Sequence, residues 1–352
     1  MDIAIIGLGA RIADVLGNLA KAAGNRIRLV GYADPCTSVG LPRLVKAGID
    51  PGRAFTDHVK MLRILKPEAV LIGSPNHLHL AHLRDALAAG CRVFCEKPVV
   101  ISLEDTWEAA GLIARHGAER VQIGLVLRSS PFFRSVMANQ GQLGRLISLE
   151  ANEHLGAAHG AFIMRDWRRK RAWSGSHILE KCCHDIDLLQ AVAGRIVRSA
   201  SFGSRAVFTP EHAGKEQDRL YHSWGKGWEG ADSAFSNDGD IIDNQVAICE
   251  TERGVRLTFH TNTHTALPQR RWLLCGLDGC LEGDFGLPEL RLRRIAADEQ
   301  KIRYAGEGAG HYGADEAMGR DLAACWLDNA AFPVPAKAAL EAGLAAMAID
   351  QA

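Results

Sequence analysis

The sequence predicts an α/β protein of two domains, a doubly wound parallel sheet followed by an α/β domain with a large, mostly antiparallel open sheet. In the first 125 residues, short continuous apolar runs alternate with helical segments, as in parallel strands that are buried on both faces. The later part has strand signals with few helices between them, which suits an open antiparallel sheet. A chain of 352 residues also fits two domains of about 100–200 residues each.

Five apolar runs are the expected strands of the first domain, and they cover residues 3–6, 28–33, 69–72, 92–94 and 121–124. The first helix is expected from Arg11 to Ala23, directly after Gly7-Leu8-Gly9. A later helix opens with Ser102-Leu103-Glu104-Asp105, which resembles a capping box. We place the domain boundary at residue 123, so the two domains cover residues 1–123 and 124–352.

The second domain shows strand signals at residues 146–155, 245–250, 255–261, 272–275 and 290–294. Residues 210–243 form a long polar stretch rich in Gly, Trp and His, which favours a functional loop or lid. Two helices, over residues 314–329 and from 336 to the C-terminus, close the chain, and we expect the last one to pack on the first domain.

Charge and cysteine usage exclude several classes of protein. Lys+Arg and Asp+Glu balance at 41 each, which argues against general binding to nucleic acid or anionic lipid. No run approaches the roughly 18 apolar residues of a membrane helix, and strand-like residues begin at Asp2, where a leader peptide would otherwise stand. Nine scattered cysteines are typical of reduced thiols, so we expect a cytoplasmic protein.

The first strand-to-helix turn has the features of a dinucleotide site. Gly7 and Gly9 permit a tight turn before the first helix, whose N-terminus can bind a pyrophosphate. The third glycine of the Rossmann fingerprint is replaced by Ile12. Asp34 ends the second strand, where a carboxylate can bind the ribose hydroxyls and repel a 2′-phosphate. We therefore expect NAD rather than NADP, although Arg11 near the turn could still meet the 2′-phosphate of NADP. The glycine pair and Asp34 would also fit a turn with a purely structural role.

Two further motifs carry a family resemblance. Gly73-Ser74-Pro75-Asn76-His77-Leu78-His79 follows the third strand, and Gly90–Pro98 runs through a strand into Glu96-Lys97-Pro98. With the opening glycines, these motifs resemble the Gfo/Idh/MocA family of nicotinamide-dependent sugar and polyol oxidoreductases. The resemblance implies that Lys97 is catalytic, that Glu96 lies near the nicotinamide ribose and that Pro98 follows a cis peptide. An ammonium group bonded to a secondary hydroxyl can stabilise the developing alkoxide.

The resemblance continues through the second half of the chain. Gly124-Leu125-Val126-Leu127-Arg128 resembles the domain-crossing strand of the family with its arginine, and Gly141-x-x-Gly144 precedes the strand at Leu146. The segment 173–188 resembles the family's glycine-rich turn and active-site helix, with the pattern Asp-x-x-x-His-x-x-Asp. By that resemblance, His184 is the active-site histidine.

This active-site segment departs from the family pattern at two positions. Glu180 stands where the family commonly has Asp, and Ser176 replaces a glycine. We expect Glu180 to tune His184 and Lys181 to bind substrate, from adjacent positions on one or two helical faces. Lys181-Cys182-x-His184-Asp185 also resembles a Lys-Cys-x-His-Asp subgroup of the family.

A metal site is not expected in this segment. Cys182, Cys183 and His184 lie close to His177 in sequence, but adjacent cysteines on a helix point about 100° apart, and a Cys-x-x-Cys pair is missing. His159 and Trp167 fall where the family's substrate-contacting strand and loop lie, although such residues often serve packing.

The predicted function is reversible hydride transfer between NAD and a secondary hydroxyl of a sugar, glycoside or cyclic polyol, in a homodimer or homotetramer formed through the C-terminal sheet. The alternatives are a lyase or hydrolase that uses NAD for a transient oxidation, with Lys181, His177 and the 210–243 stretch as extra acid/base sources, and a non-catalytic NAD or sugar sensor. The candidate residues are Lys97, His184 and Glu180 for catalysis; Gly7, Gly9, Ala10, Arg11, Ile12, Asp34, Ser74, Pro75, Asn76, His79, Glu96, Lys97 and Arg128 for the cofactor; and Lys97, Arg128, His159, Trp167, Lys181 and His184 for the substrate.

Overall fold

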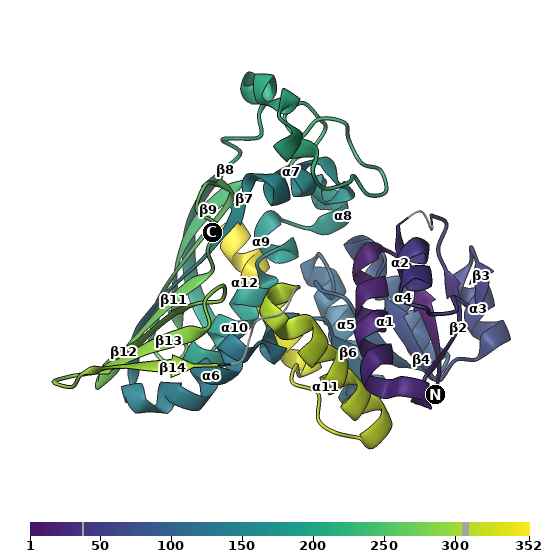
Figure 1. Cartoon of the computed structure of the whole chain (residues 1–352), viewed down its shortest axis with the longest axis horizontal. Coiled ribbons are helices and arrows are strands. Elements are labelled where there is room, and N and C mark those ends of the chain that lie inside the picture. Colours follow the sequence, from purple (N-terminus) through teal and green to yellow (C-terminus); the bar gives the residue numbers. More distant parts are fainter. Residues whose placement is uncertain (37–38, 305–309) are drawn as a thin grey trace. The chain divides into compact units, whose positions relative to one another are not determined.

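The computed structural model describes residues 1–36, 39–304 and 310–352, which form two compact units (Figure 1). The first unit contains Met1–Ser129 and Ala314–Gly343, and the second contains Ser130–Gly313 and Leu344–Ala352. The C-terminal helix α12 (Ala336–Gln351) contributes residues to both units. Within the described ranges, no helix is long and apolar enough to span a membrane.

The first unit is built on a six-stranded parallel sheet, as the sequence predicts. Strands β1 and β4 lie in its centre, and every residue of β4 is buried, which explains the continuous apolar runs. The sequence prediction missed β3, a three-residue edge strand with two exposed residues. In sheet order the strands are β3 (Arg53–Phe55), β2 (Arg28–Ala33), β1 (Asp2–Ile6), β4 (Ala69–Ile72), β5 (Arg92–Cys95) and β6 (Val121–Ile123).

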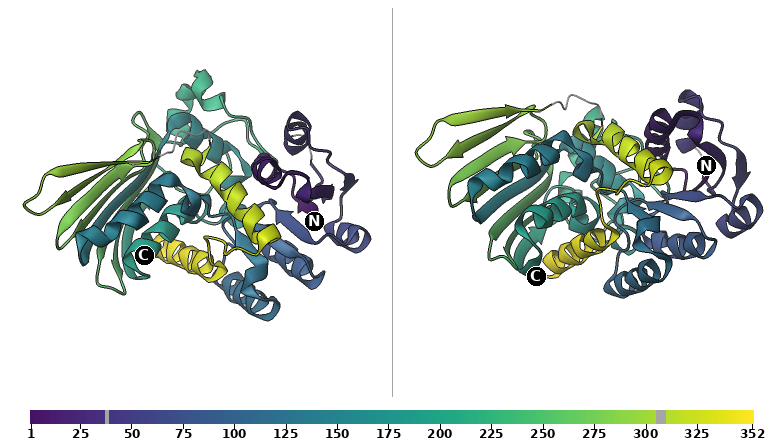
Figure 2. Two further views of the ribbon diagram at one scale, coloured as in Figure 1. Left: turned by 60° about the horizontal axis from the view of Figure 1, so that its bottom comes forward. Right: turned by 90° about the horizontal axis from the view of Figure 1, so that it is seen from below.

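Helices cover both faces of this sheet (Figure 2). Ser102 caps α5, with its hydroxyl accepting a hydrogen bond from the Asp105 amide at 3.1 Å, which confirms the predicted helix start. Helix α11 packs closely on α1, because Gly319 leaves room for the backbone of Asn18. One layer holds α1 (Ala10–Ala23), α2 (Gly40–Lys46) and α11 (Ala314–Asp328), and the other holds α3 (His58–Leu65), α4 (His79–Ala88) and α5 (Leu103–His116).

The chain after β6 differs from the predicted domain-crossing strand. Strand β6 ends at Ile123. The Gly124 amide donates the last hydrogen bond between β6 and β5, to the Cys95 carbonyl. Residues Val126–Ser129 then form a 3-10 turn, and the Ser129 hydroxyl donates to Asp321 of α11 at 2.5 Å. Arg128 is therefore half-buried in a turn, and the expectation of a strand at Gly124–Arg128 is wrong.

The second unit is built on an eight-stranded sheet that is antiparallel except for the parallel pair β7–β10. Burial alternates along β9, so one face of the sheet packs inward and the other is open. The prediction missed β8, β12 and β14, which are polar or half-exposed. In sheet order the strands are β14 (Glu299–Arg303), β13 (Glu289–Arg294), β12 (Gly279–Asp284), β11 (Arg271–Gly276), β7 (Leu146–Gly156), β10 (Arg256–Thr265), β9 (Asn244–Thr251) and β8 (Ile196–Ser204).

Helices α6 (Pro131–Asn139) and α10 (Cys183–Ala193) pack on the covered face of this sheet. Three further helices belong to the unit: α7 (Ala157–Arg165), α8 (Arg171–Ser174) and α9 (His177–Glu180). Helix α7 contacts β7 and β10, and it continues directly from the end of β7.

The stretch 210–243 is a folded segment with a small core of its own. It contains the 3-10 helices η7 (Pro210–Gln217) and η8 (Arg219–His222). Tyr221 and Phe235 are buried with Phe208 against α7. The Asp243 carboxylate closes the segment by accepting hydrogen bonds from the amides of residues 206, 207 and 208 at 2.8 to 2.9 Å. These contacts fix the segment on α7 at one end of the sheet.

Candidate functional site

In the first unit, the glycine turn between β1 and α1 has the backbone that a dinucleotide phosphate requires. Gly7 has a φ of +82°, and a Cβ there would clash with the backbone of Ser74. Gly9 is the N-cap of α1 and supplies no side-chain cap to the helix amides. The first amides of α1 are therefore available to an anion, with the favourable end of the helix dipole.

Ile12 stands in place of the third glycine of the fingerprint, and the small residue at the contact between helix and sheet is instead Gly73, directly after β4. Ile12 is fully buried under the turn. A Cβ on Gly73, at the end of β4, would lie 2.5 Å from the Cβ of Ile12. The close packing of helix on sheet that the third glycine normally permits is thus achieved here by Gly73.

Asp34 lies directly after β2, at the glycine turn. Its Oδ2 accepts a hydrogen bond from the Leu8 amide at 2.5 Å, and its Oδ1 accepts one from the Cys36 amide at 2.6 Å. Burial raises the pKa of Asp34, and the two amides oppose that shift. A pocket of about 430 Å³ lies beside the carboxylate and is lined also by Arg53, Phe55 and other residues of β2 and β3. The pocket has the size of a small-ligand site.

Arg11, which the sequence places near the glycine turn, is held by two carboxylates. Its Nε lies 3.0 Å from Glu96 Oε1, and its Nη1 lies 2.5 Å from Asp315 Oδ1 of α11. Its Nη2 is buried and has no hydrogen-bond partner among the described residues. An unpaired buried donor is costly, and a polar group of a bound dinucleotide would satisfy it. The glycine turn and this donor both fit NAD(P).

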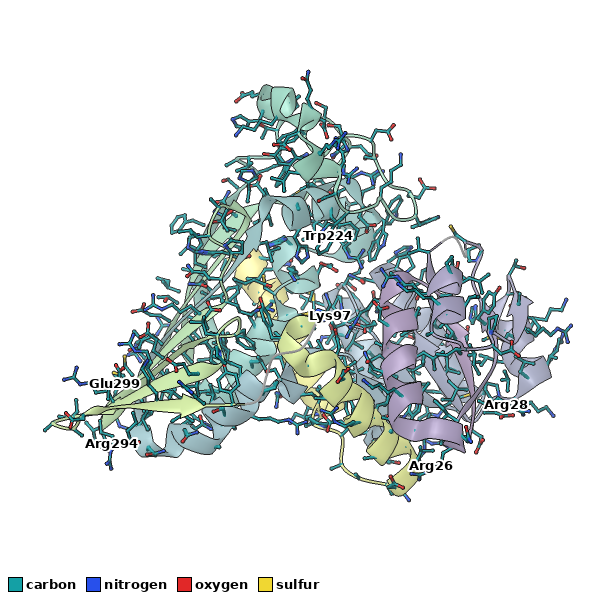
Figure 3. The ribbon with its side chains drawn as sticks, viewed as in Figure 1. Arg26, Arg28, Lys97, Trp224, Arg294 and Glu299 are labelled. Carbon is teal, nitrogen blue, oxygen red and sulfur yellow. The ribbon has the colours of Figure 1, made fainter. Side chains whose placement is uncertain are left out.

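Lys97, labelled in Figure 3, follows β5. The Lys97–Pro98 peptide is cis, which confirms the expected geometry. Glu96 is buried between Arg11 and the Lys97 amide, which donates to Glu96 Oε2 at 3.2 Å. Both ring nitrogens of His79 lie against carbonyl oxygens, 2.7 Å from Pro98 and 2.9 Å from Ser74. His79 therefore contributes by holding the 74–76 turn to the Lys97–Pro98 turn, and its side chain is not directed at a cofactor as the sequence led us to expect.

In the second unit, the predicted active-site helix is two short helices. Helix α9 ends at Glu180 and α10 begins at Cys183, with Cys182 at a ψ near 0°. His184 therefore lies in the first turn of α10, buried, with its ring centroid 6.0 Å from that of His311. The prediction of one continuous helix is wrong, because the backbone turns at residues 181 and 182.

Glu180 is bound to an arginine that is not among the predicted site residues. Arg168 Nε lies 2.9 Å from Glu180 Oε1, and Arg168 Nη1 lies 2.6 Å from Asp166 Oδ1. Its guanidinium also lies over the ring of Trp167, 4.4 Å from the centroid. Trp167 is buried, so it supports Arg168 and offers little surface to a substrate. Two buried carboxylates are thus satisfied by one guanidinium.

Lys181 belongs to a buried network below α10. Its Nζ lies 3.3 Å from Glu153 Oε1, and Arg270 bridges Glu153 at 2.6 Å and Asp185 at 2.8 Å. Burial favours a raised pKa for Glu153, but Arg270 and Lys181 outweigh it and lower that pKa to about 2. Burial raises the pKa of Asp185 to about 7, against the attraction of Arg270. Arg270 lies 85 positions after Asp185 and 117 positions after Glu153. A local sequence motif therefore could not reveal this network.

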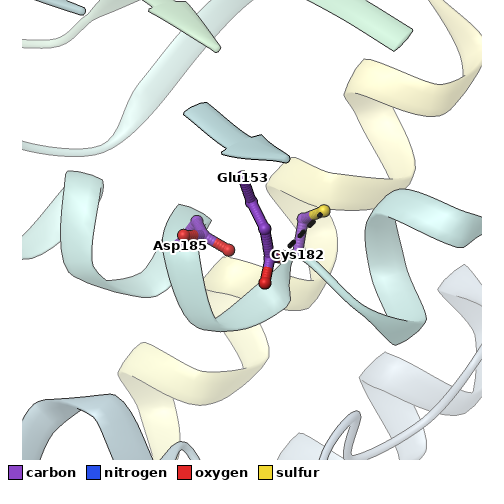
Figure 4. Close-up of side chains that lie close together, drawn as sticks. All are labelled: Glu153, Cys182 and Asp185. Atoms are coloured by element: carbon purple, nitrogen blue, oxygen red, sulfur yellow. Dashed lines mark hydrogen bonds between the residues drawn. The ribbon is translucent and has the colours of Figure 1, made fainter. Parts of the chain in front are cut away.

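Three potential metal ligands lie together in this network (Figure 4). Ligand atoms of Glu153, Cys182 and Asp185 all lie within 4.8 Å of one another. Arg270 already neutralises both carboxylates, and burial raises the pKa of Cys182 well above its ordinary value. A thiol and two carboxylates paired with a guanidinium form a structural ion network rather than a cation site.

The remaining predicted residues of the second unit are two histidines. His159 is half-buried on α7, and burial followed by the charge of Lys181 lowers its pKa to about 2. His177 is buried, with Nε2 3.2 Å from the Thr261 hydroxyl, and burial lowers its pKa to about 4. Both imidazoles are therefore neutral at neutral pH.

Comparison with known proteins agrees with this description. Residues 1–125 match the family described as "Oxidoreductase family, NAD-binding Rossmann fold", and residues 136–282 match "GFO/IDH/MocA C-terminal domain". The chain is 24% identical over 315 residues to the oxidoreductase YteT of Bacillus subtilis (75% of this chain, 73% of that protein). It is 26% identical over 260 residues to the inositol 2-dehydrogenase of Burkholderia cenocepacia (73% of this chain, 66% of that protein).

The fold is also that of solved structures with little sequence identity. A levoglucosan dehydrogenase in complex with NADH and levoglucosan matches with a TM-score of 0.79 at 14% identity, over 100% of this chain and 96% of that one. Both halves of the chain thus match the models of one family, and their residues form the dinucleotide turn and the two sheets described above. The chain belongs to the Gfo/Idh/MocA family of NAD(P)-dependent oxidoreductases.

Proposed function

We propose that this protein catalyses reversible hydride transfer between NAD and a secondary hydroxyl of a sugar, glycoside or cyclic polyol. One observation carries the proposal: Glu96, the neighbour of Lys97, is bonded to Arg11 in the first turn of α1. This bond ties the lysine-bearing turn to the glycine turn within one unit. The inositol dehydrogenase relative acts on a substrate of the proposed class.

The chemistry assigned to this chain is proton management and orientation. Bound NAD supplies the hydride acceptor. Lys97 hydrogen-bonds the carbinol oxygen and stabilises the developing alkoxide, and His184 takes up or returns the proton. Glu180, fixed by Arg168, tunes His184, and Lys181, His159 and Arg128 contact the substrate. The motif Lys181-Cys182-x-His184-Asp185 supports placement in the Lys-Cys-x-His-Asp subgroup.

NAD is the proposed cofactor because Asp34 places a carboxylate beside the glycine turn. A ribose diol can donate to this carboxylate, whereas a 2′-phosphate would be repelled by it. The cations Arg53 and Lys60 line the same pocket and would attract a 2′-phosphate. The proposed preference for NAD over NADP therefore depends on the position of Asp34 and not on the net charge of the pocket.

The alternative of a transient oxidation needs further acid/base groups near the substrate. One of its proposed sources has another role in the structure, since His177 is buried and its Nε2 lies 3.2 Å from the Thr261 hydroxyl. A non-catalytic sensor has no need of both Lys97 and His184. These observations favour net dehydrogenation over both alternatives.

The open face of the C-terminal sheet is the proposed surface for a homodimer or homotetramer. It exposes Phe202 at 84% and Ile248 at 58% of their surfaces. Exposed apolar side chains on neighbouring strands are typical of a face that is covered in an assembly.

A substrate screen tests the proposed function. The protein is incubated with sugars, inositols and glycosides in the presence of NAD or NADP, and formation of the reduced nicotinamide is followed by its absorbance. We expect turnover with NAD and at least one member of the panel, with one NADH formed per product. Product formation while NADH stays bound and recycled would favour the transient-oxidation alternative, and binding without turnover would favour the sensor.

A further inference from the structure

Two tryptophans of the second unit remain exposed although the segment that carries them is firmly held. Trp224 and Trp228 are separated by Gly-Lys-Gly and expose 45% and 41% of their surfaces. They lie in the segment 210–243 that folds against α7. A partly exposed indole offers a planar apolar surface on which a ligand can stack.

Buried charged residues hold the backbone of this tryptophan segment. Arg165 Nη2 donates to the Trp224 carbonyl at 2.6 Å, and Arg169 Nη1 donates to the Glu229 carbonyl at 2.6 Å. Asp166 Oδ2 accepts from the Gly227 amide at 3.1 Å. These three anchors are nearly inaccessible to solvent, so the indoles are presented by a rigid backbone, which reduces the entropy lost on binding a ligand.

The same anchors connect the segment to the candidate catalytic residues. Asp166, which binds the Gly227 amide, also binds Arg168, and Arg168 binds Glu180. The guanidinium of Arg168 lies over Phe162, 5.6 Å from its centroid, and the Phe162 ring lies 5.5 Å from that of Trp224. A continuous set of contacts therefore runs from Glu180 to Trp224.

The Trp224 ring is stacked on His159, with 4.6 Å between centroids and 28° between the planes. Burial, followed by the charge of Lys181, lowers the pKa of His159, so the ring that Trp224 stacks on is neutral. Trp224 thus adds an aromatic ring beside His159, which is one of the candidate substrate residues. A partly exposed indole face is suited to the apolar C–H face of a sugar ring or to an aromatic ring.

We propose that Trp224, stacked on His159, binds a second ring of the substrate, so that the substrate class is a glycoside or oligosaccharide rather than a free monosaccharide or inositol. This inference rests on the proposed function and deepens it. The reacting ring lies against the face of His184 and Lys181, and the ring attached through the glycosidic oxygen stacks on the indole.

Matched substrate pairs test the inference. Binding of free glucose, galactose, mannose and xylose and of their phenyl glycosides is measured by titration calorimetry without cofactor, and NADH formation is measured separately with NAD. We expect at least one phenyl glycoside to bind tenfold or more tightly than its free sugar. Trp224→Ala should reduce that ratio to below threefold, and Trp224→Phe should keep most of it.

Trp107→Ala is the matched control, because Trp107 is 70% exposed on α5 of the first unit. Trp107→Ala should leave the ratio of phenyl-glycoside affinity to free-sugar affinity unaltered. If Trp224→Ala unfolds, Trp224→Gln takes its place. Equal glycoside binding by the wild-type protein and the Trp224 variants, or no binding of any glycoside, overturns the inference. Glycoside binding that depends on Trp224 without NADH formation contradicts the proposed function alone, and NADH formation without dependence on Trp224 contradicts the inference alone.

Discussion

Lys97 is the residue on which the proposed chemistry depends most. It is placed by its neighbours on both sides, since Glu96 is bonded to Arg11 and the Pro98 carbonyl contacts His79. Lys97→Ala should lower kcat by about two to four orders of magnitude, the usual scale for a lost proton transfer. The affinity for NAD should change little, because the turn itself is held by backbone and Glu96 contacts.

Two measurements check the Lys97 prediction. Initial rates with the best substrate give kcat, and calorimetric titration gives the dissociation constant for NAD. Lys46→Ala, an exposed lysine of α2, is the control and should leave both values unchanged. Near-normal turnover of the Lys97 variant would remove Lys97 from the mechanism.

Substitutions of a second single residue, Asp34, test the preference for NAD over NADP. Asp34→Ala should weaken NAD binding and narrow its advantage over NADP, because the carboxylate that meets the ribose is lost. Asp34→Asn is the companion variant, since its amide oxygen can still accept from the Leu8 amide while the charge is removed. Titration of both cofactors into the three proteins provides the comparison. Tenfold tighter binding of NADP by the wild-type protein, about 1.4 kcal/mol, would contradict this role of Asp34.

At the scale of elements, alanine substitution of two glycines in the β1–α1 segment should change the stability of the protein in opposite directions. Gly7→Ala forces a side chain into a φ of +82° and against Ser74, which should cost about 1–3 kcal/mol and at least tenfold in NAD affinity. Gly17→Ala meets nothing within 4 Å in the middle of α1, so it should stabilise the protein by about 0.5–1 kcal/mol. Urea unfolding and NAD titration measure both, and similar effects of the two changes would refute this account of the turn.

Local patterns predicted five of the six strands of the first sheet, because those strands are apolar and largely buried. The three-residue edge strand β3 escaped prediction, since two of its residues are exposed. The strands β8, β12 and β14 escaped prediction, since their residues are polar or half-exposed and their pairing is decided by the neighbouring strand. The break between α9 and α10 was missed because the periodicity of Glu180, Lys181 and His184 fits one helix. Arg270 was missed because its carboxylate partners lie 85 and 117 positions away in sequence. Arg168 was missed because its bond to Glu180, 12 positions away, depends on how the turns between them fold.

At the scale of the whole molecule, buried neutral histidines should make the fold sensitive to acid. Burial lowers the pKa of His177 to about 4, whereas an unfolded histidine titrates near about 6.5. The unfolded state therefore binds more protons, and stability is lost as pH falls from about 6.5 toward 4. From this group alone, the free energy of unfolding should fall by about 2 kcal/mol between pH 7 and 5.

Urea unfolding of variants at the two pH values isolates this contribution. His177→Gln should show a smaller loss between pH 7 and 5 than the wild-type protein. His116→Gln, in the last turn of α5, is the control and should leave the loss unchanged. An identical pH dependence in the His177 variant would show that His177 is not buried in the neutral form.

The central claim is direct hydride transfer from a substrate carbon to NAD, and the isotope content of NADH tests it most directly. The protein is incubated with NAD and a perdeuterated form of the best substrate from the screen, and the NADH released is analysed by mass spectrometry. We predict that each NADH carries one deuterium and that one labelled NADH forms per product molecule. Release of product without NADH, or NADH that carries no deuterium, would contradict the account.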